Sequence, residues 1–206
     1  MRSSAPDKQI LLLGNSLFEG YGLFRGQEAP ALMQQKMISA NLPYKIINAG
    51  LSGDTSAGAL QRLPDLLDQH QDLDALVIEL GSNDAVMGVP PSQIQSNIED
   101  IIRLARRVHP PITIYLFQLK IWPPFVMDRD YIRQYKQIYI DVARSRSVIL
   151  LPFFMDNIIR RPELLQSDQI HPNAKGTQIM AENMWQALQP YLKRDSYQQA
   201  SEPKNE

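Results

Sequence analysis

The sequence contains no cysteine, which excludes disulfide bonds, cysteine-ligated zinc and a thiol nucleophile. It also lacks an excess of either charge: 21 basic residues face 22 acidic ones, so nothing indicates a nucleic-acid partner. No apolar run approaches the roughly 20 residues that span a bilayer, and stable membrane insertion is not expected. The sequence contains three histidines, so few residues of this type are candidates for a general base.

The first residues, MRSSAPDKQ, lead straight into a strand-like run and lack the apolar core of a signal peptide. A cytoplasmic location is therefore expected for the chain as given, with the periplasm or secretion as the alternative if a signal has been removed. A length of 206 residues with 44% hydrophobic residues predicts one domain and a monomer. We expect an N-terminal extension over 1–8, the domain over 9–192 and a disordered polar tail over 193–206.

Short aliphatic runs alternate with longer amphipathic ones along the chain. Strands are expected over residues 9–13, 44–48, 75–80, 112–117 and 148–151. Helices are expected over residues 30–40, 55–69, 92–108, 130–146 and 173–192, the third of them capped by Ser92. Because the strands read as continuous apolar stretches, they suit a parallel sheet with helices on both faces, an α/β fold.

A hydroxyl group follows the first expected strand at once, since QILLLGNSL places Ser16 just past the last buried position. Gly, Asn and Ser are usual turn residues, but open α/β sheets also place active sites at the carboxyl ends of strands. A serine nucleophile needs a base. His70 lies in a polar connection and His109 ends a helix with no acid nearby in sequence, which leaves His171.

His171 stands in SDQIHPN, three residues after Asp168. At this spacing on a turn the two side chains can lie side by side, so that Asp168 accepts from one imidazole nitrogen while the other faces outward. Pro172 favours an extended conformation at His171 and suits the first position of the next helix. From these residues alone, an acid–base pair and an ordinary turn with a capping aspartate remain open.

Two further loops offer donors for an oxyanion. Gly53 in INAGLSGDTS permits close approach of its backbone amide, and Asn83 in ELGSNDAV has a side-chain amide just past a strand. Taken singly, Gly53 can be a turn and Asn83 a helix cap. Ser52 is a rival nucleophile, although no Gly-x-Ser-x-Gly elbow surrounds it. All four segments follow strands, which predicts that they share one edge of the sheet.

The blocks LLLGNSL, NAGLSGDTS, LGSND and DQIHPN resemble those of the SGNH (GDSL-type) hydrolases, and most closely their thioesterase and lysophospholipase branch. The resemblance covers most of the expected domain, in order. It implies a three-layer αβα, flavodoxin-like fold with a five-stranded parallel sheet. It also implies a triad of Ser16, His171 and Asp168, oxyanion donors at the Ser16 and Gly53 amides and the Asn83 side chain, and no cofactor or metal.

One residue departs from the family pattern, because Asn15 stands where Gly-Asp-Ser-Leu usually has aspartate. An amide keeps the hydrogen-bonding shape and removes a negative charge beside the serine. We expect the fold and the mechanism to survive, and the hydrogen bonds that hold the Ser16 turn to differ.

The sequence thus predicts a serine hydrolase that cleaves small-molecule acyl esters and acyl-CoA-type thioesters, with lysophospholipids as a further class, through an acyl-enzyme on Ser16. The alternatives are a short-chain or carbohydrate acetyl esterase and a non-catalytic α/β ligand-binding module.

An aromatic segment follows the fourth expected strand, FQLKIWPPFVMDRD. We expect Trp122 and Phe125 to bind substrate as an exposed acyl-groove wall beside Ser16, stiffened by Pro123 and Pro124. The alternative is that these side chains pack under the loop and complete the core. The first block should add three aromatic residues to this groove, Phe18, Tyr21 and Phe24.

Overall fold

The computed structural model describes residues 8–122 and 125–201, with side chains as far as Asp195. It contains one five-stranded parallel sheet in the order β2-β1-β3-β4-β5. The strands are β1 (Lys8–Gly14), β2 (Tyr44–Gly50), β3 (Leu73–Glu79), β4 (Thr113–Phe117) and β5 (Ile149–Leu151). All five expected strands are present, with ends displaced by at most two residues.

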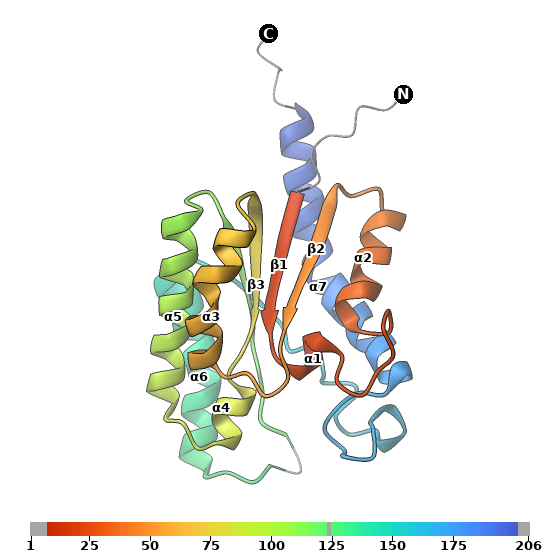
Figure 1. Ribbon diagram of the computed structural model, residues 1–206. Helices are drawn as coiled ribbons and strands as arrows, with labels where there is room; N and C mark the ends of the chain where they lie inside the picture. The colour runs from red at the N-terminus through yellow and green to blue at the C-terminus, as the bar shows by residue number, and fades with distance from the viewer. Residues whose placement is uncertain (1–7, 123–124, 202–206) are drawn as a thin grey trace.

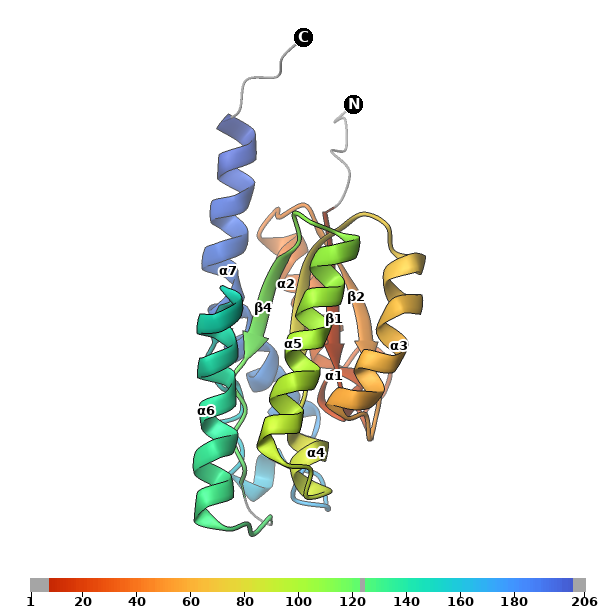
Figure 2. The same ribbon diagram turned by 90° about the vertical axis from the view of Figure 1, so that its left-hand side faces the viewer.

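Helices cover both faces of the sheet. They are α1 (Ser16–Glu19), α2 (Ala29–Ser39), α3 (Ser56–Gln69), α4 (Ser82–Val86), α5 (Pro91–Val108), α6 (Arg129–Arg146) and α7 (Ala174–Ser201), with a 3-10 turn at Pro162–Leu164. α3, α5 and α6 form one layer, and α2 and α7 form the other (Figures 1 and 2). The three-layer αβα fold is therefore confirmed.

Burial of apolar strands explains this arrangement. Ile10 to Leu13 in β1 are fully buried, as parallel strands covered on both faces require. In α5 one helical face is buried, and its residues include Ile94, Ile98, Ile101, Ile102 and Ala105. The expected Ser92 cap is wrong: the helix begins at Pro91 with Pro90 as N-cap and no side-chain cap bond. Proline is tolerated at the first helical position, that of Pro91, because it has no N–H group that would need a partner.

At the two ends of the chain, the observed structure agrees only in part with the expected domain limits. Lys8 already pairs with Tyr44 in the sheet, whereas residues 1–7 of the expected extension lie outside the described residues. At the other end α7 continues to Ser201, so residues 193–201 of the expected tail are helical, and 202–206 lie outside the described residues. Among the described residues, no helix has the length and apolar character needed to cross a bilayer.

The strand order distinguishes the edge of the sheet at the carboxyl ends of the strands from the opposite edge. The chain moves from β1 outward to β2, and then returns to β3 on the other side of β1, which makes a topological switch point between β1 and β3. Ligand sites of open α/β sheets lie outside the carboxyl ends of the strands at such a point. Here the short helices α1 and α4 lie at that edge, the lower one in Figure 1.

Candidate active site

Ser16 is the first residue of α1, directly beyond the end of β1. Asn15 is the N-cap of this one-turn helix, and its side-chain oxygen accepts a hydrogen bond of 3.0 Å from the Leu17 amide. The glycine before it is required by close packing, because a Cβ on Gly14 would lie 2.6 Å from the Phe18 ring. The abrupt end of the aliphatic strand therefore produces a tight strand-to-helix turn that presents a half-buried hydroxyl group.

His171 connects this hydroxyl group to Asp168. The His171 Nε2 atom lies 2.9 Å from the Ser16 Oγ atom, and its Nδ1 atom lies 2.7 Å from Asp168 Oδ2. The other carboxylate oxygen accepts from the backbone amides of His171 at 3.0 Å and Ile170 at 2.9 Å. Burial disfavours the charged form of Asp168, but these hydrogen bonds outweigh it and lower the pKa of the carboxyl group below its usual value.

The loop that carries His171 is fixed by side chains that the sequence did not single out. Gln166 donates its side-chain amide to the Tyr21 carbonyl at 2.7 Å and to the Pro172 carbonyl at 3.0 Å, which joins the loop after α1 to the histidine loop. Asn173 caps α7 by accepting from the Gly176 amide at 3.0 Å. Pro172 was expected to suit the first position of this helix, but α7 begins at Ala174. Pro172 forms an isolated bridge with Leu165 instead.

The loops that carry Gly53 and Asn83 meet, although β1 lies between the strands β2 and β3 that precede them. Gly53 has a φ of +79°, which suits glycine, in the loop after β2. Asn83 belongs to α4 after β3, and its side-chain amide donates to the Asp54 carbonyl at 2.7 Å. The helix-cap alternative for Asn83 is wrong, because the N-cap of α4 is Gly81. One of the two Asn83 side-chain N–H groups thus holds the Gly53 loop and leaves the other for a ligand.

An ion pair beneath this loop also escaped the sequence analysis. Arg62 of α3 pairs with the buried carboxylate of Asp54 at 2.8 Å. The same guanidinium donates to the carbonyl of Ala49 at 2.7 Å and of Gly14 at 3.3 Å. It therefore ties the Gly53 loop to the ends of both β1 and β2. The spacing of Asp54 and Arg62 in the sequence carries no motif that would have indicated the pair.

A second buried carboxyl group lies behind the Ser16 turn. Glu79, the last residue of β3, is fully buried and accepts hydrogen bonds from the Asn15 side-chain amide at 3.1 Å and the Asn15 backbone amide at 3.3 Å. Burial raises the pKa of Glu79 to about 8, although both hydrogen bonds from Asn15 act to lower it. The same Asn15 amide donates to Ser82 Oγ at 2.9 Å, at the start of α4. Glu79 and Ser82 are therefore the groups to which Asn15 donates in holding the Ser16 turn.

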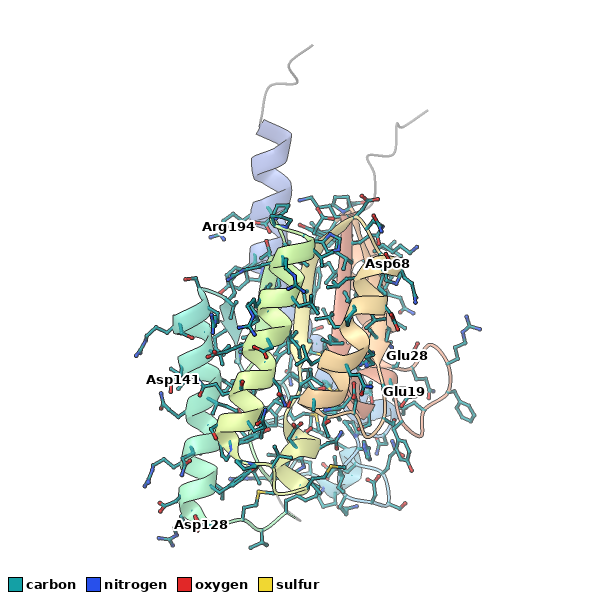
Figure 3. The ribbon with its side chains drawn as sticks, turned by 60° about the vertical axis from the view of Figure 1, so that its left-hand side comes forward. Glu19, Glu28, Asp68, Asp128, Asp141 and Arg194 are labelled. Carbon is teal, nitrogen blue, oxygen red and sulfur yellow. The ribbon has the colours of Figure 1, made fainter. Side chains whose placement is uncertain are left out.

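The rival residues lie in other surroundings. The Ser52 amide donates to the carboxylate of Glu19 at 2.8 Å, and the Ser52 hydroxyl group donates to the same carboxylate. Glu19 is the last residue of α1 and is labelled in Figure 3. His70 ends α3, and Asp68 two residues before it lies near the opposite edge of the sheet in Figure 3. Within residues 8–122 and 125–195, no group of three or more histidine, aspartate or glutamate side chains could hold a metal ion.

The exposed aromatic wall expected beside Ser16 is wrong for two residues. Trp122 is only 5% exposed and packs against Phe153, with ring centroids 5.7 Å apart. Phe18 is fully buried in the core. It stacks on Phe154, with ring centroids 6.3 Å apart, so both Trp122 and Phe18 belong to the core, as the core alternative required. Pro123 and Pro124, the expected stiffening residues, lie outside the described residues.

Phe125 and two residues of the first block remain accessible. Phe125 is half-buried, and with Trp122 it lines a cavity of about 20 Å³ together with Ala85 and Val86 of α4. That space holds little more than one water molecule. Tyr21, which is 51% exposed, lies over the imidazole ring of His171 at a centroid distance of 4.6 Å. Phe24 is 83% exposed.

Comparison with known proteins gives a consistent result. The model of the GDSL-like lipase/acylhydrolase family matches residues 12–179. The chain is 37% identical to thioesterase 1/protease 1/lysophospholipase L1 of Escherichia coli K12, over 95% of this chain and 89% of that protein. It is 34% identical to esterase TesA of Pseudomonas aeruginosa, over 93% of each. The crystal structure of esterase EstA from Pseudoalteromonas sp. matches with a TM-score of 0.84 and 29% identity, over 91% of this chain and all of that one.

Proposed function

The chain belongs to the GDSL-like lipase/acylhydrolase family and is a serine esterase, and we propose that it cleaves acyl esters and thioesters through an acyl-enzyme on Ser16. One observation carries this assignment. The hydrogen-bonded series from Ser16 Oγ through His171 to Asp168 has distances of 2.9 and 2.7 Å, within the range that a nucleophile and its base require.

In the first half of the reaction His171 Nε2 takes the proton of Ser16 Oγ, which attacks the acyl carbon. Asp168 holds the proton on Nδ1 and stabilises the imidazolium ion that forms. The low pKa of Asp168 supports this role, because the carboxylate stays charged throughout the neutral range. The carbonyl oxygen of the substrate becomes an oxyanion, which accepts hydrogen bonds from the Ser16 and Gly53 amides and from Asn83.

In the second half His171 gives its proton to the leaving alcohol or thiol, and the acyl group stays on Ser16. Water then enters, loses a proton to His171 Nε2 and attacks the acyl-enzyme. The oxyanion donors act a second time, and the serine regains its proton. No step needs a metal ion or an organic cofactor.

The relatives' names indicate acyl esters and thioesters as the substrate class, and lysophospholipids as one member of it. A second candidate, a short-chain acetyl esterase, is favoured by the small cavity at Phe125, which has about 20 Å³ and would not hold a longer acyl chain. Initial rates over a series of acyl esters and thioesters from acetyl to dodecanoyl distinguish the two. A rise in kcat/KM with chain length favours the acyl esterase, and a preference for acetyl favours the second candidate.

A fluorophosphonate probe tests the nucleophile. We expect stoichiometric labelling of Ser16, found by peptide mass spectrometry, and loss of both labelling and turnover in Ser16→Ala. The control is Ser52→Ala, which should be labelled at the wild-type rate because Ser52 bonds to Glu19 and not to a histidine. A label on Ser52 would contradict the assignment.

We further propose that the enzyme is a monomer, since every residue of the proposed site comes from one chain. Light scattering across a hundredfold concentration range tests this, and a mass of twice 23.5 kDa would contradict it.

A further inference from the structure

The carboxyl group of Glu79 lies directly behind the turn that carries Ser16. It is fully buried, and its two oxygens accept from the side-chain and backbone amides of Asn15, at 3.1 and 3.3 Å. A Cβ on Gly14 would lie 3.0 Å from Glu79 Oε2, so the carboxyl group packs against the last residue of β1. Both bonds end on the residue next to the serine, and any shift of Glu79 therefore acts on the Ser16 turn.

Both N–H groups and the oxygen of the Asn15 side chain are hydrogen-bonded in this turn. Its oxygen accepts from the Leu17 amide at 3.0 Å, and its nitrogen donates to Glu79 Oε1 and to Ser82 Oγ, the latter at 2.9 Å. Ser82 directly precedes Asn83 in α4. An ionised aspartate at position 15 has no side-chain donor. Its side chain could form a hydrogen bond with Glu79 only if the Glu79 carboxyl group carried a proton and donated it. With asparagine, the N–H groups for both Glu79 oxygens come from residue 15.

We propose that Glu79 is a positioning residue for the nucleophile: acting through Asn15, it fixes the Ser16 turn in the orientation that meets His171. This inference rests on the proposed role of Ser16. Glu79 does not touch the reacting atoms, and its effect passes through two hydrogen bonds to a single residue. The required property is a lone pair that can accept a hydrogen bond at each oxygen, which the carboxylate and the neutral carboxyl group both have, because each oxygen faces an N–H group of Asn15.

The other polar groups around Glu79 have partners of their own. From α6, Tyr139 donates its hydroxyl group to the Leu80 carbonyl at 3.0 Å and bonds to Tyr135. From α4, Asp84 accepts from the Ser56 amide at 2.9 Å. From α3, Arg62 contacts the Gly14 carbonyl. In the part of the chain that the structure describes, the hydrogen bonds shown for Glu79 therefore come from Asn15.

The charge of Glu79 gives the kinetic consequence a pH dependence. Burial raises the pKa of Glu79 to about 8, so the carboxyl group is neutral at pH 7 and gains a negative charge above pH 8. That charge appears behind the proposed oxyanion donor at the Ser16 amide, where it opposes the negative charge of the transition state. We expect kcat to fall as the pH rises through 8, with KM nearly constant.

Glu79→Gln tests the proposal, because it keeps the shape and replaces one acceptor by a donor that meets an N–H group of Asn15. We expect kcat at pH 7 to fall at least about tenfold, as for the loss of one buried hydrogen bond, with KM within about twofold. The fall of kcat above pH 8 should disappear. Adding Asn15→Asp supplies the missing acceptor, so the double variant should recover most of kcat, while Asn15→Asp alone stays within about tenfold of wild type.

The matched control is Glu99→Gln, which removes a carboxylate that pairs with Arg146 between α5 and α6. It should leave kcat and its pH profile unchanged. Wild-type kcat and pH profile in Glu79→Gln would overturn the inference, and so would a double variant no better than Glu79→Gln alone. If Glu79→Gln alone does not fold, the double variant decides by its kcat relative to Asn15→Asp. Fluorophosphonate mapping keeps the two proposals apart, because labelling of Ser16 in wild type tests the proposed function alone.

Discussion

Glu79 also makes the stability of the fold depend on pH. Its pKa is about 8 in the folded protein, against an ordinary value of 4.5. Between these two values the folded protein keeps the proton and the unfolded chain has lost it, so unfolding releases a proton. The free energy of unfolding therefore falls by about 1.4 kcal/mol per pH unit across this interval, or about 5 kcal/mol in all.

The sign follows from the direction of the pKa change. The stability is fully present below pH 4.5, is lost as the pH rises, and levels off above pH 8 because both states are then ionised. The lowered pKa values of Asp168 and Glu182 act in the opposite direction, and only as the pH falls below their usual range. The raised pKa of the buried Tyr135 acts only above pH 10. The interval from pH 5 to pH 8 is therefore the one in which to isolate Glu79.

Urea unfolding at half-unit steps from pH 5 to pH 9, in wild type and in Glu79→Gln, measures this effect. Glutamine does not titrate, so the difference in unfolding free energy between the two proteins should change by several kcal/mol in favour of the variant as the pH rises. Contributions that are the same in both proteins cancel in the difference. Parallel pH dependences in the two proteins would refute the reasoning, since they would mean that Glu79 titrates alike in the folded and unfolded states.

Three further predictions concern the catalytic site and its apolar border. Asn83→Ala should lower kcat by about 10²–10³ with little change in KM, and a rise in KM alone would make Asn83 a substrate-binding residue. Asp168→Asn should lower kcat by about 10⁴ while Ser16 stays in place, because the imidazole then favours the wrong tautomer, and near wild-type turnover would exclude Asp168 as the acid. Phe125→Ala should flatten the dependence of kcat/KM on acyl-chain length and leave acetyl-ester turnover unchanged, and an unaltered dependence would exclude Phe125 from the substrate site; Trp122→Ala should instead lower the free energy of unfolding by about 3–5 kcal/mol, because its ring belongs to the core.

The sheet was predictable because its strands carry the signal locally. A parallel strand covered on both faces is a continuous apolar run, and Ile10 to Leu13 of β1 are fully buried. The neighbourhood of Ser16 and His171 was predictable for a topological reason. Residues that follow parallel strands fall at one edge of the sheet, however far apart they are in the sequence.

The short elements and the buried charges were not predictable in this way. Helices of four and five residues, α1 and α4, are too short to show a 3.6-residue period. Glu79 reads as a polar strand end, and only the packing of β1 and β3 shows that its carboxyl group is enclosed. The exposure of Trp122 was predicted wrongly for a related reason, because whether an aromatic ring in a loop packs inward or outward depends on the space beneath the loop. These features depend on contacts between segments far apart in the sequence.

The three proposed oxyanion donors are joined to one another by side-chain hydrogen bonds. Asn15 fixes the Ser16 turn and donates to Ser82, the residue before Asn83. Asn83 in turn donates to the Asp54 carbonyl, and so holds the loop that contains Gly53. Removal of the Asn83 side chain therefore takes away one donor and also the bond that holds a second donor in place. The loss in Asn83→Ala then contains a positioning component, and its size cannot be assigned to one hydrogen bond to the oxyanion.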